Sequence, residues 1–401
     1  MTTSEQHRPR LILARGKEKA LQRRHPWIFS GAIARVEGAP QEGDVVDVLS
    51  AQGAWMAVGH YQHESIAVKV ISYDNPAVDE ALWAARFRSA LDYRQRLGLF
   101  GDLGRTNAFR LVNGEGDRLP GLIADLYGDV LVLQAHSVGM HRLFPLFAPM
   151  LAAQVQGRGV RLRALFDKSS ATLRDGTAVQ DGFIWGEAEA DGTFLEEGNA
   201  LAVNFYDGQK TGAFLDQRVN HARVRALAKG TRVLNAFGYT GAFSLAALRG
   251  GADYVETVDI SRRAIELCQS NVEANFPHAP HKGVVADAMR YLDDLPRDFD
   301  LVILDPPAFA KTHRTLQQGL KGYRNINQKA MAAIRPGGLL FTFSCSQAVG
   351  MADFRTMAFS AAALARRHVR VVRDLHHAPD HPVSIFHPEG DYLKGLLLQV
   401  E

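Results

Sequence analysis

Apolar runs with strand character recur at regular spacing through the C-terminal half of the chain, and stretches with helical periodicity separate them. This alternation is typical of βαβ units, in which consecutive strands are parallel and helices cover the sheet. It therefore predicts an α/β domain built on a doubly wound parallel sheet. The expected strands are 232–234, 254–258, 283–286, 301–304 and 339–343, completed by 369–372 and 395–400, and the expected helices are 242–248, 262–275 and 325–334.

Two shorter regions precede this domain and have other patterns. Residues from about 9 to 75 hold β-favouring runs at 45–49 and 66–71 between glycine-bearing turns, which predicts a small β-rich domain. Farther along, one long amphipathic helix is followed by short strands and tight turns, which predicts an α+β unit. We therefore expect three domains, with the boundaries 1–75, 76–190 and 191–401.

Length and composition are those of a globular protein with more than one domain. The 401 residues exceed what one hydrophobic core usually holds, and 46% hydrophobic with 22% charged residues is an ordinary balance. No apolar run approaches the roughly 20 residues of a membrane span, and the polar, basic stretch from Met1 to Arg15 is unlike a secretory signal. Two cysteines give no disulfide framework, so we expect a cytoplasmic protein without a membrane partner.

Charge is almost balanced over the whole chain but not within its N-terminal stretch. The 46 basic and 43 acidic residues leave a net charge of only +3, which does not by itself indicate a nucleic-acid partner. Near the N-terminus basic residues outnumber acidic ones, and this stretch is either a solvated basic face or a phosphate-binding patch. The residues are Arg8, Arg10, Arg15, Lys17, Lys19, Arg23 and Arg24, against Glu5 and Glu18.

The first strand of the α/β domain runs into a glycine-bearing turn and then into a helix. Glycines at such a turn let the backbone approach a ligand closely at the helix N-terminus. The spacing is Gly-x-x-Gly rather than the Gly-x-Gly-x-x-Gly of dinucleotide-binding folds, so a pyrophosphate cradle is not expected. The candidate cofactor contacts in this turn are Asn235, Phe237, Gly238, Tyr239, Thr240 and Gly241.

Carboxylates end the second and third predicted strands. Asp259 follows the glycine turn at a distance suited to hydrogen bonds with two ribose hydroxyls, and Asp287 could meet an adenine amino group. Three consecutive strand ends of this kind favour an adenosine-containing cofactor over coincidence. Without a pyrophosphate loop, the set resembles the class I S-adenosylmethionine-dependent methyltransferases. The resemblance implies S-adenosylmethionine as the cofactor, with Asp305 at the fourth strand end bordering both the cofactor and the methyl acceptor.

Two strand ends carry side chains able to do chemistry. One strand stops at Asp305, followed by Pro306 and Pro307, and the other stops at Cys345 between two serines. The helical stretch between them predicts a βαβ crossover, so the two ends should lie roughly 5 Å apart if the strands are neighbours. Many methyltransferases of amino groups in nucleic acids end this strand in Asp/Asn-Pro-Pro-aromatic, and the inserted Ala308 weakens an amino-group assignment.

A thiol at this edge favours methylation of cytosine at C5. Addition of a thiolate to C6 makes C5 nucleophilic enough to take a methyl group from a sulfonium, and loss of the C5 proton then releases the thiolate. Cys345 fits the nucleophile, and Asp305 fits the group that supports N3, for which it would have to carry or share a proton. Cys268 instead shares a helix face with apolar residues and is expected in the core. The base for the C5 proton stays open among Lys311, Tyr323 and a water.

Several long and uncommon stretches point to one family. They are His25–Gly31, Phe109–Glu115, Leu119–Ile123, Lys210–Arg218, Leu304–Phe309, Lys321–Asn327, Phe343–Ser346 and Asp391–Gly395. Over nearly its whole length the chain is similar to the bacterial large-subunit ribosomal RNA cytosine-C5 methyltransferase I family. The resemblance implies an N-terminal, barrel-like PUA domain that binds RNA, a central α+β domain and a Rossmann-like catalytic domain. It further implies that Cys345 attacks a cytosine of 23S rRNA or of a large-subunit precursor, and that Gln217 and Arg218 line the cofactor site.

Three other functions fit parts of this pattern. A class I methyltransferase could act on another RNA position, such as a guanine nitrogen. A nicotinamide-dependent oxidoreductase uses a related sheet, and an RNA-binding protein could keep the sheet without turnover. No metal site is expected, and the sequence leaves open whether the protein is a monomer or a homodimer.

Overall fold

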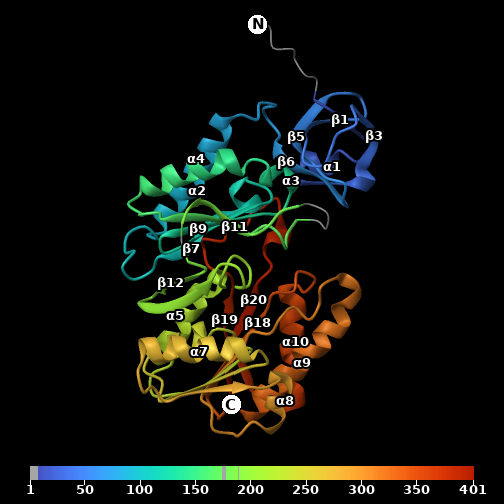
Figure 1. Ribbon diagram of the computed structural model, residues 1–401. Helices are drawn as coiled ribbons and strands as arrows, with labels where there is room; N and C mark the ends of the chain where they lie inside the picture. The colour runs from blue at the N-terminus through green and yellow to red at the C-terminus, as the bar shows by residue number, and fades with distance from the viewer. Residues whose placement is uncertain (1–7, 174–177, 188) are drawn as a thin grey trace. The chain divides into compact units, whose positions relative to one another are not determined.

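The structure, a computed structural model, describes residues 8–173, 178–187 and 189–401 (Figure 1). The beginning of the basic N-terminal stretch, including Glu5, lies outside the described residues. Within the described ranges, no helix combines the length and apolar character needed to cross a membrane. The chain forms two compact units. The first takes in the described part of Met1–Gly192 with Val203–Ala213 and Pro379–Gly390, and the second consists of Thr193–Ala202, Phe214–Ala378 and Asp391–Glu401.

A six-stranded sheet with the order β2-β6-β5-β4-β1-β3 forms the N-terminal part of the first unit. The predicted strands at 45–49 and 66–71 are confirmed, and their alternation places Val46, Val48 and Val68 in a common core. The elements are β1 (Arg10–Leu13), α1 (Lys19–Gln22), β2 (Trp27–Phe29), β3 (Ile33–Glu37), β4 (Val45–Leu49), β5 (Trp55–Tyr61) and β6 (Ile66–Ser72).

A second sheet of the first unit has the order β11-β10-β9-β8-β7. Two helices, α2 and α4, pack with it, and the rings of Trp83 and Phe87 on α2 meet the ring of Phe147 on α4 edge to face. The elements are α2 (Glu80–Arg96), β7 (Ala108–Asn113), β8 (Leu122–Tyr127), β9 (Val130–Ala135), α3 (Val138–His141), α4 (Phe144–Gln156), β10 (Ala164–Asp167) and β11 (Gly182–Gly186). Farther along the chain, β12 (Asp191–Glu196) and β13 (Asn199–Asn204) form a two-stranded sheet.

The second unit is built on a seven-stranded sheet with the order β16-β15-β14-β17-β18-β20-β19. Neighbours from β16 to β18 are parallel, as the βαβ pattern predicts. β20 runs antiparallel to both of its neighbours, so the expectation of a wholly parallel sheet was wrong at this edge. The strands are β14 (Arg232–Ala236), β15 (Tyr254–Asp259), β16 (His281–Val285), β17 (Leu301–Leu304), β18 (Gly338–Ser344), β19 (Val369–Leu375) and β20 (Lys394–Val400).

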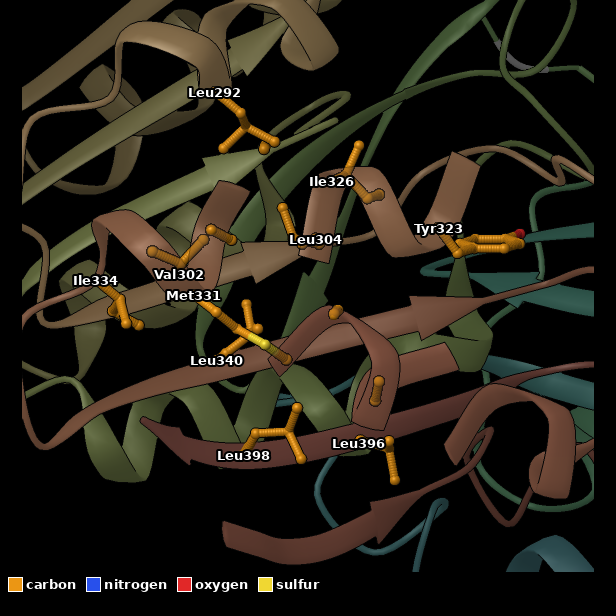
Figure 2. Close-up of a cluster of buried hydrophobic side chains, with 14 of the residues drawn as sticks. Leu292, Val302, Leu304, Tyr323, Ile326, Met331, Ile334, Leu340, Leu396 and Leu398 are labelled. Carbon is orange, nitrogen blue, oxygen red and sulfur yellow. The ribbon is translucent and has the colours of Figure 1, made fainter. Parts of the chain in front are cut away.

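Hydrophobic cores lie on both faces of this sheet. Successive side chains of a strand point to opposite faces, so Val302 and Leu304 join one core whereas Leu301 and Ile303 join the other. Figure 2 shows the first of these cores, in which the strand side chains meet Ile326 and its neighbours on α9. The helices are α5 (Arg218–Leu227), α6 (Ala242–Arg249), α7 (Arg262–Asn275), α8 (Ala288–Tyr291), α9 (Leu316–Ala333) and α10 (Met351–Ala365).

The crossover from β17 to β18 brings the two chemically able strand ends together. The two strands are parallel neighbours, with Leu304 paired to Thr342. The connecting helix α9 starts at Leu316, earlier than the 325 expected from the pattern. Buried side chains of α9 pack against β17 and β18 in one hydrophobic core. This packing fixes the positions of the two strand ends from which the following loops begin.

Candidate active site

The turn after β14 has unusual backbone geometry. Phe237 and Tyr239 have φ values of 62° and 45°, in the left-handed region that favours glycine, and Gly241 follows with 86°. Holding a non-glycine residue there costs on the order of 1 kcal/mol, and such strain is concentrated at ligand-binding sites. α6 starts directly after the turn, and Gly241 has no side chain to cap it. The first N–H groups of α6 can therefore bind a ligand carboxylate.

Both glycines of this turn are required by the close packing beneath it. A Cβ atom at Gly241 would lie 2.3 Å from Cys268 Sγ, and one at Gly238 would lie 2.3 Å from Thr257 Cγ2. The turn thus rests directly on α7 and β15. Cys268 is fully buried, as predicted, and burial raises the pKa of its thiol to about 11. This cysteine is a packing residue.

A chain of polar side chains supports the same turn from below. Asn235 Nδ2 donates to Ser244 Oγ over 2.9 Å, and Ser244 Oγ lies 2.7 Å from Thr257 Oγ1. Thr257 Oγ1 in turn lies 2.8 Å from His281 Nε2. Burial lowers the pKa of His281 to about 4, so the chain is uncharged at neutral pH. Because Asn235 is fully buried, its side chain holds the turn in place, and its direct contact with a cofactor stays a prediction.

Asp259, at the end of β15, fastens the turn through its carboxylate. Its Oδ2 accepts from the Tyr239 N–H over 3.0 Å, and its Oδ1 accepts from the Ser261 N–H over 2.9 Å. A carboxylate has about four acceptor sites, so ribose hydroxyls can bind alongside these two donors. The next residue, Ile260, is 74% exposed and presents an apolar surface that the sequence pattern did not single out.

Asp287 lies one strand farther along the same sheet edge. The Ala286 N–H donates to the Asp259 carbonyl oxygen over 2.9 Å, which ties the ends of β15 and β16 together. Asp287 is exposed, and its Oδ1 caps α8 by accepting from the Met289 N–H over 2.9 Å. The structure therefore gives Asp287 a capping contact, and its contact with an adenine amino group stays a prediction.

The end of β17 is joined to the segment that enters α5. Gln217 Nε2 donates to Asp305 Oδ2 over 3.0 Å, and Gln217 Oε1 accepts from Asn220 over 2.6 Å. Gln217 and its neighbour Arg218 are both buried. The structure thus brings Gln217, which only the family resemblance pointed to, into direct contact with the predicted catalytic carboxylate. The remaining turn residue of the predicted set, Thr240, accepts a hydrogen bond from Asn271 through its carbonyl oxygen.

Cys345 and Asp305 lie at adjacent strand ends, which confirms the predicted pairing of β17 with β18. Cys345 Sγ lies 4.0 Å from the carbonyl oxygen of Pro306, the residue that follows Asp305. The thiol is half-buried, whereas that of Cys268 is enclosed. A half-buried cysteine at a ligand-facing edge can reach a substrate, and an enclosed one cannot.

One serine pins the loops after β17 and β18 to each other. Ser346 Oγ accepts from the Ala310 N–H over 3.1 Å and lies 2.9 Å from the hydroxyl oxygen of Tyr323. Tyr323 is fully buried against Phe309, and burial raises the pKa of its hydroxyl. Tyr323 therefore fixes the two loops and is poorly suited to accept a proton from a substrate.

A buried lysine completes this end of the sheet. Lys394, the first residue of β20, is 4% exposed, and its Nζ donates to the Ser346 carbonyl oxygen over 2.9 Å. Burial lowers the pKa of this ammonium, while the charges of Asp391 and Cys345 oppose that shift. A cationic group thus lies close to the thiol. In the sequence this lysine starts a largely apolar strand and lies within the stretch Asp391–Gly395 that carries the family resemblance, but no pattern assigned it a role.

The cofactor side of the edge fits a nucleoside that carries an amino-acid arm. The start of α6 offers N–H donors to a carboxylate, and the strained turn brings backbone close to a ligand. Asp259 offers acceptors to ribose hydroxyls, and Ile260 offers an apolar surface to a base. These are the chemical parts of S-adenosylmethionine.

Two family models match the chain. The PUA-like domain matches residues 11–73, which hold nearly all of the sheet β1–β6. The S-adenosylmethionine-dependent methyltransferase model matches residues 132–397, more than half of the chain, including β14 to β19. Both matches agree with the folds seen in these parts of the structure.

Curated relatives match over almost the full length. Ribosomal RNA large subunit methyltransferase I of Erwinia tasmaniensis is 38% identical over 98% of this chain and 99% of its own length, and the protein of the same name from Shewanella denitrificans gives the same values. A putative S-adenosylmethionine-dependent methyltransferase from Streptococcus mutans shares the fold, with a TM-score of 0.81 at 23% identity over 98% of this chain and 100% of that chain. The chain therefore belongs to the S-adenosylmethionine-dependent methyltransferase family that includes the ribosomal RNA large subunit methyltransferases I, and S-adenosylmethionine is its cofactor.

Proposed function

We propose that this protein transfers a methyl group from S-adenosylmethionine to C5 of one cytosine in 23S rRNA, through a covalent bond between Cys345 Sγ and C6 of the base. The observation that carries the proposal is the half-buried thiol of Cys345 beside the Asp305–Pro306 strand end. Methylation of an exocyclic nitrogen needs no thiol nucleophile, whereas C5 of cytosine has to be activated by one.

Support for an RNA substrate comes from the N-terminal domain and from the relatives. Residues 11–73 match a PUA-like domain, which the family resemblance assigns to RNA binding. Relatives at 38% identity are named for methylation of large-subunit ribosomal RNA. A ribosomal substrate would also place the activity in the cytoplasm.

The first step is addition of the thiolate to the base. Cys345 Sγ forms a bond to C6, and the electrons of the C5–C6 double bond move towards C5. The thiolate needs a stabilising positive charge, and Lys394 supplies one from its position on Ser346.

The second step forms the carbon–carbon bond. Bound S-adenosylmethionine supplies an electrophilic methyl group on a positively charged sulfur. The electron pair at C5 would form the new bond to the methyl carbon, while the electrons of the methyl–sulfur bond would stay with the departing sulfur. Asp305 and Gln217, held together at 3.0 Å, orient the base so that C5 faces the cofactor side of the edge.

The last step removes the C5 proton and frees the enzyme. Loss of this proton re-forms the C5–C6 double bond, and Cys345 leaves C6 as a thiolate. The Tyr323 hydroxyl lies against Ser346 Oγ and burial raises its pKa, which makes it a poor proton acceptor. Lys311, exposed on the loop after β17, and a water are the acceptors that remain.

Asp305 has two possible roles that differ in its protonation state. A proton on Asp305 would let it donate to N3 of the base as negative charge develops there. The amide donor Gln217 suits the ionised carboxylate instead, and a carboxylate would accept from the N4 amino group. In Asp305→Asn the single amide oxygen can go on accepting from Gln217 Nε2, which leaves an N–H donor towards the base. The variant should therefore retain substantial activity in the first role and lose most of it in the second.

Nucleoside analysis of ribosomal RNA tests the assignment. Ribosomal RNA from a strain that lacks the protein is incubated with the purified enzyme and S-adenosylmethionine, digested and analysed by mass spectrometry. We expect 5-methylcytidine with the wild-type enzyme and none with Cys345→Ala. A methylated guanine, or wild-type rates with Cys345→Ala, would favour a class I methyltransferase acting on a nitrogen and would overturn the covalent route.

A mechanism-based trap tests the adduct directly. RNA that contains 5-fluorocytidine carries fluorine in place of the removable C5 proton, so the enzyme–RNA bond should persist after methyl transfer. We expect a denaturation-resistant complex with the wild-type enzyme and with Cys268→Ala. Cys345→Ala should form none.

A further inference from the structure

A polar pocket of about 500 Å³ lies in the first unit, between α2 and the loop that follows β7. Arg88 and Arg96 line it from one side of α2, about two helical turns apart, and Arg118 lines it from the loop. All three side chains are exposed. In the part of the chain that the structure describes, none of the three forms an ion pair with a carboxylate.

The carboxylates in the wall of this pocket are already neutralised by other arginines. Asp117 pairs with the buried Arg94 over 2.6 Å, and Asp92 pairs with Arg158. With those two pairs balanced, the wall keeps the full positive charge of its three exposed arginines. Like charges that line one pocket repel each other, and a bound anion relieves the repulsion.

Arg118 occupies a backbone position that suits glycine. It follows the 3-10 turn Gly114–Asp117 with a φ of 60°, where an L-residue is strained relative to glycine. Behind it, the buried Arg86 donates to the Arg118 carbonyl oxygen. The charge of Arg118 therefore stands in front of a second guanidinium, which strengthens the positive potential at the pocket.

We propose that Arg88, Arg96 and Arg118 bind backbone phosphates of the substrate RNA in this pocket. Guanidinium groups match phosphate oxygens with paired hydrogen bonds, and phosphate contacts position a nucleic acid without reading its sequence. This inference rests on the RNA substrate proposed above. It adds a second RNA contact, on α2, to the one expected at the PUA-like domain.

Salt dependence of RNA binding is the measurement that tests this contact. Binding of a 23S rRNA transcript to the full-length protein is measured over a series of KCl concentrations. Each phosphate contact contributes about 0.7 to 0.9 to the slope of log affinity against log salt. The triple variant Arg88→Gln, Arg96→Gln, Arg118→Gln should therefore lose about 2 to 3 from this slope and bind roughly a hundredfold more weakly at physiological salt.

Two sets of control variants separate charge from structure. Arg161→Gln removes an exposed arginine of the same unit outside the pocket and should leave the slope unchanged. The triple change of the same three arginines to Lys should keep most of the slope, because the charge remains. An unchanged slope in the Gln variant, or a loss of affinity without a change of slope, would overturn the proposal. The proposal would also be overturned if inorganic phosphate bound at the pocket but the Gln variant kept the wild-type slope of RNA affinity against salt.

The outcome can be told apart from a failure of the proposed methylation. The slope is measured without methyl transfer, and binding of S-adenosylmethionine to the triple variant checks that the second unit is intact. If no 5-methylcytidine forms but the slope falls as expected, the pocket binds RNA and the assigned chemistry is wrong. If 5-methylcytidine forms and the slope does not change, the pocket proposal alone fails.

Discussion

The two cysteines of this protein lie in the same unit but in opposite surroundings. Cys268 is enclosed beneath the glycine turn, where its thiol fills the space that a Cβ at Gly241 would need, and burial raises its pKa to about 11. Cys345 is half-buried at the end of β18, next to a strand end with a carboxylate and close to the charge of Lys394. One thiol shapes a backbone surface, and the other lies at the edge where we propose that the substrate base binds.

The difference extends to the two halves of the sheet edge. Around β14, β15 and β16, side chains such as Ser244 and Thr257 support a strained turn, so we expect a ligand to meet mainly backbone groups there. Around β17, β18 and β20, hydrogen bonds to Ser346 hold the loops in place. The side chains of Asp305 and Cys345 lie at this part of the edge. Substitutions should therefore act through binding and stability on the first half, and through turnover on the second.

The largest expected effect separates the two thiols. Cys345→Ser should lower methyl transfer by roughly 10⁴-fold or more, because the nucleophile is lost, and it should leave the affinity for S-adenosylmethionine unchanged. Cys268→Ser should keep turnover within about threefold. Initial rates and calorimetric titration with the cofactor measure both. Comparable loss of turnover in the two variants would erase the distinction between them.

Gly241→Ala tests whether the turn is held by close packing. The new methyl group would meet Cys268 Sγ at 2.3 Å and also occupy a φ of 86°, so we expect a loss of about 2 to 4 kcal/mol in unfolding free energy and weaker cofactor binding. Gly230→Ala, at a φ of 70° with nothing nearby, should cost only about 1 kcal/mol.

Adding Cys268→Ala to Gly241→Ala should recover part of the lost stability, because it removes the clashing sulfur. The remaining deficit measures the backbone strain alone. Urea unfolding of the two single variants and the double variant closes a double-mutant cycle. Strictly additive losses would show that Cys268 does not press on the turn.

Acid should weaken the first half of the edge through His281. Its pKa is lowered to about 4 in the folded protein, so between pH 6.5 and 4 the unfolded chain binds a proton that the folded chain does not. The stabilisation is complete above pH 6.5 and is lost as the pH falls, by up to about 3 kcal/mol. His281→Gln should flatten this part of the pH–stability curve, whereas the exposed His313→Gln should not. If the pH–stability curves of the two variants were the same, burial of His281 would not be the cause of the acid sensitivity.

Strand positions and one chemical pairing could be predicted from the sequence because they depend on local patterns. Helix α7 has the bounds expected from its periodicity, and Asp305 and Cys345 follow neighbouring strands because parallel strands joined by a helix tend to be neighbours. The antiparallel direction of β20 could not be predicted, since alternation carries no direction. The contact of Gln217 with Asp305 joins residues far apart in the sequence and followed from no local pattern.

Lys394 shows most clearly why part of the site escaped prediction. A lysine at the start of a strand usually points to water, and only the long-range packing of β20 beside the loop after β18 buries it. Its Nζ then finds the Ser346 carbonyl oxygen at 2.9 Å. The sequence holds the residue, but its electrostatic role depends on partners from β18.

The smallest expected effect tests that role. Lys394→Met removes the positive charge near Cys345, so a thiolate should form only at higher pH and iodoacetamide should alkylate Cys345 about tenfold more slowly at neutral pH. Lys394→Arg should keep most of the rate, because the charge is retained, and Lys229→Met, which removes an exposed charge after α5, serves as the control. The rate of alkylation over a range of pH, followed by peptide mass spectrometry, resolves Cys345 from the enclosed Cys268. If Lys394→Met leaves this pH profile in place, the lysine only packs the two loops, and activation of the thiol has to come from the bound substrate.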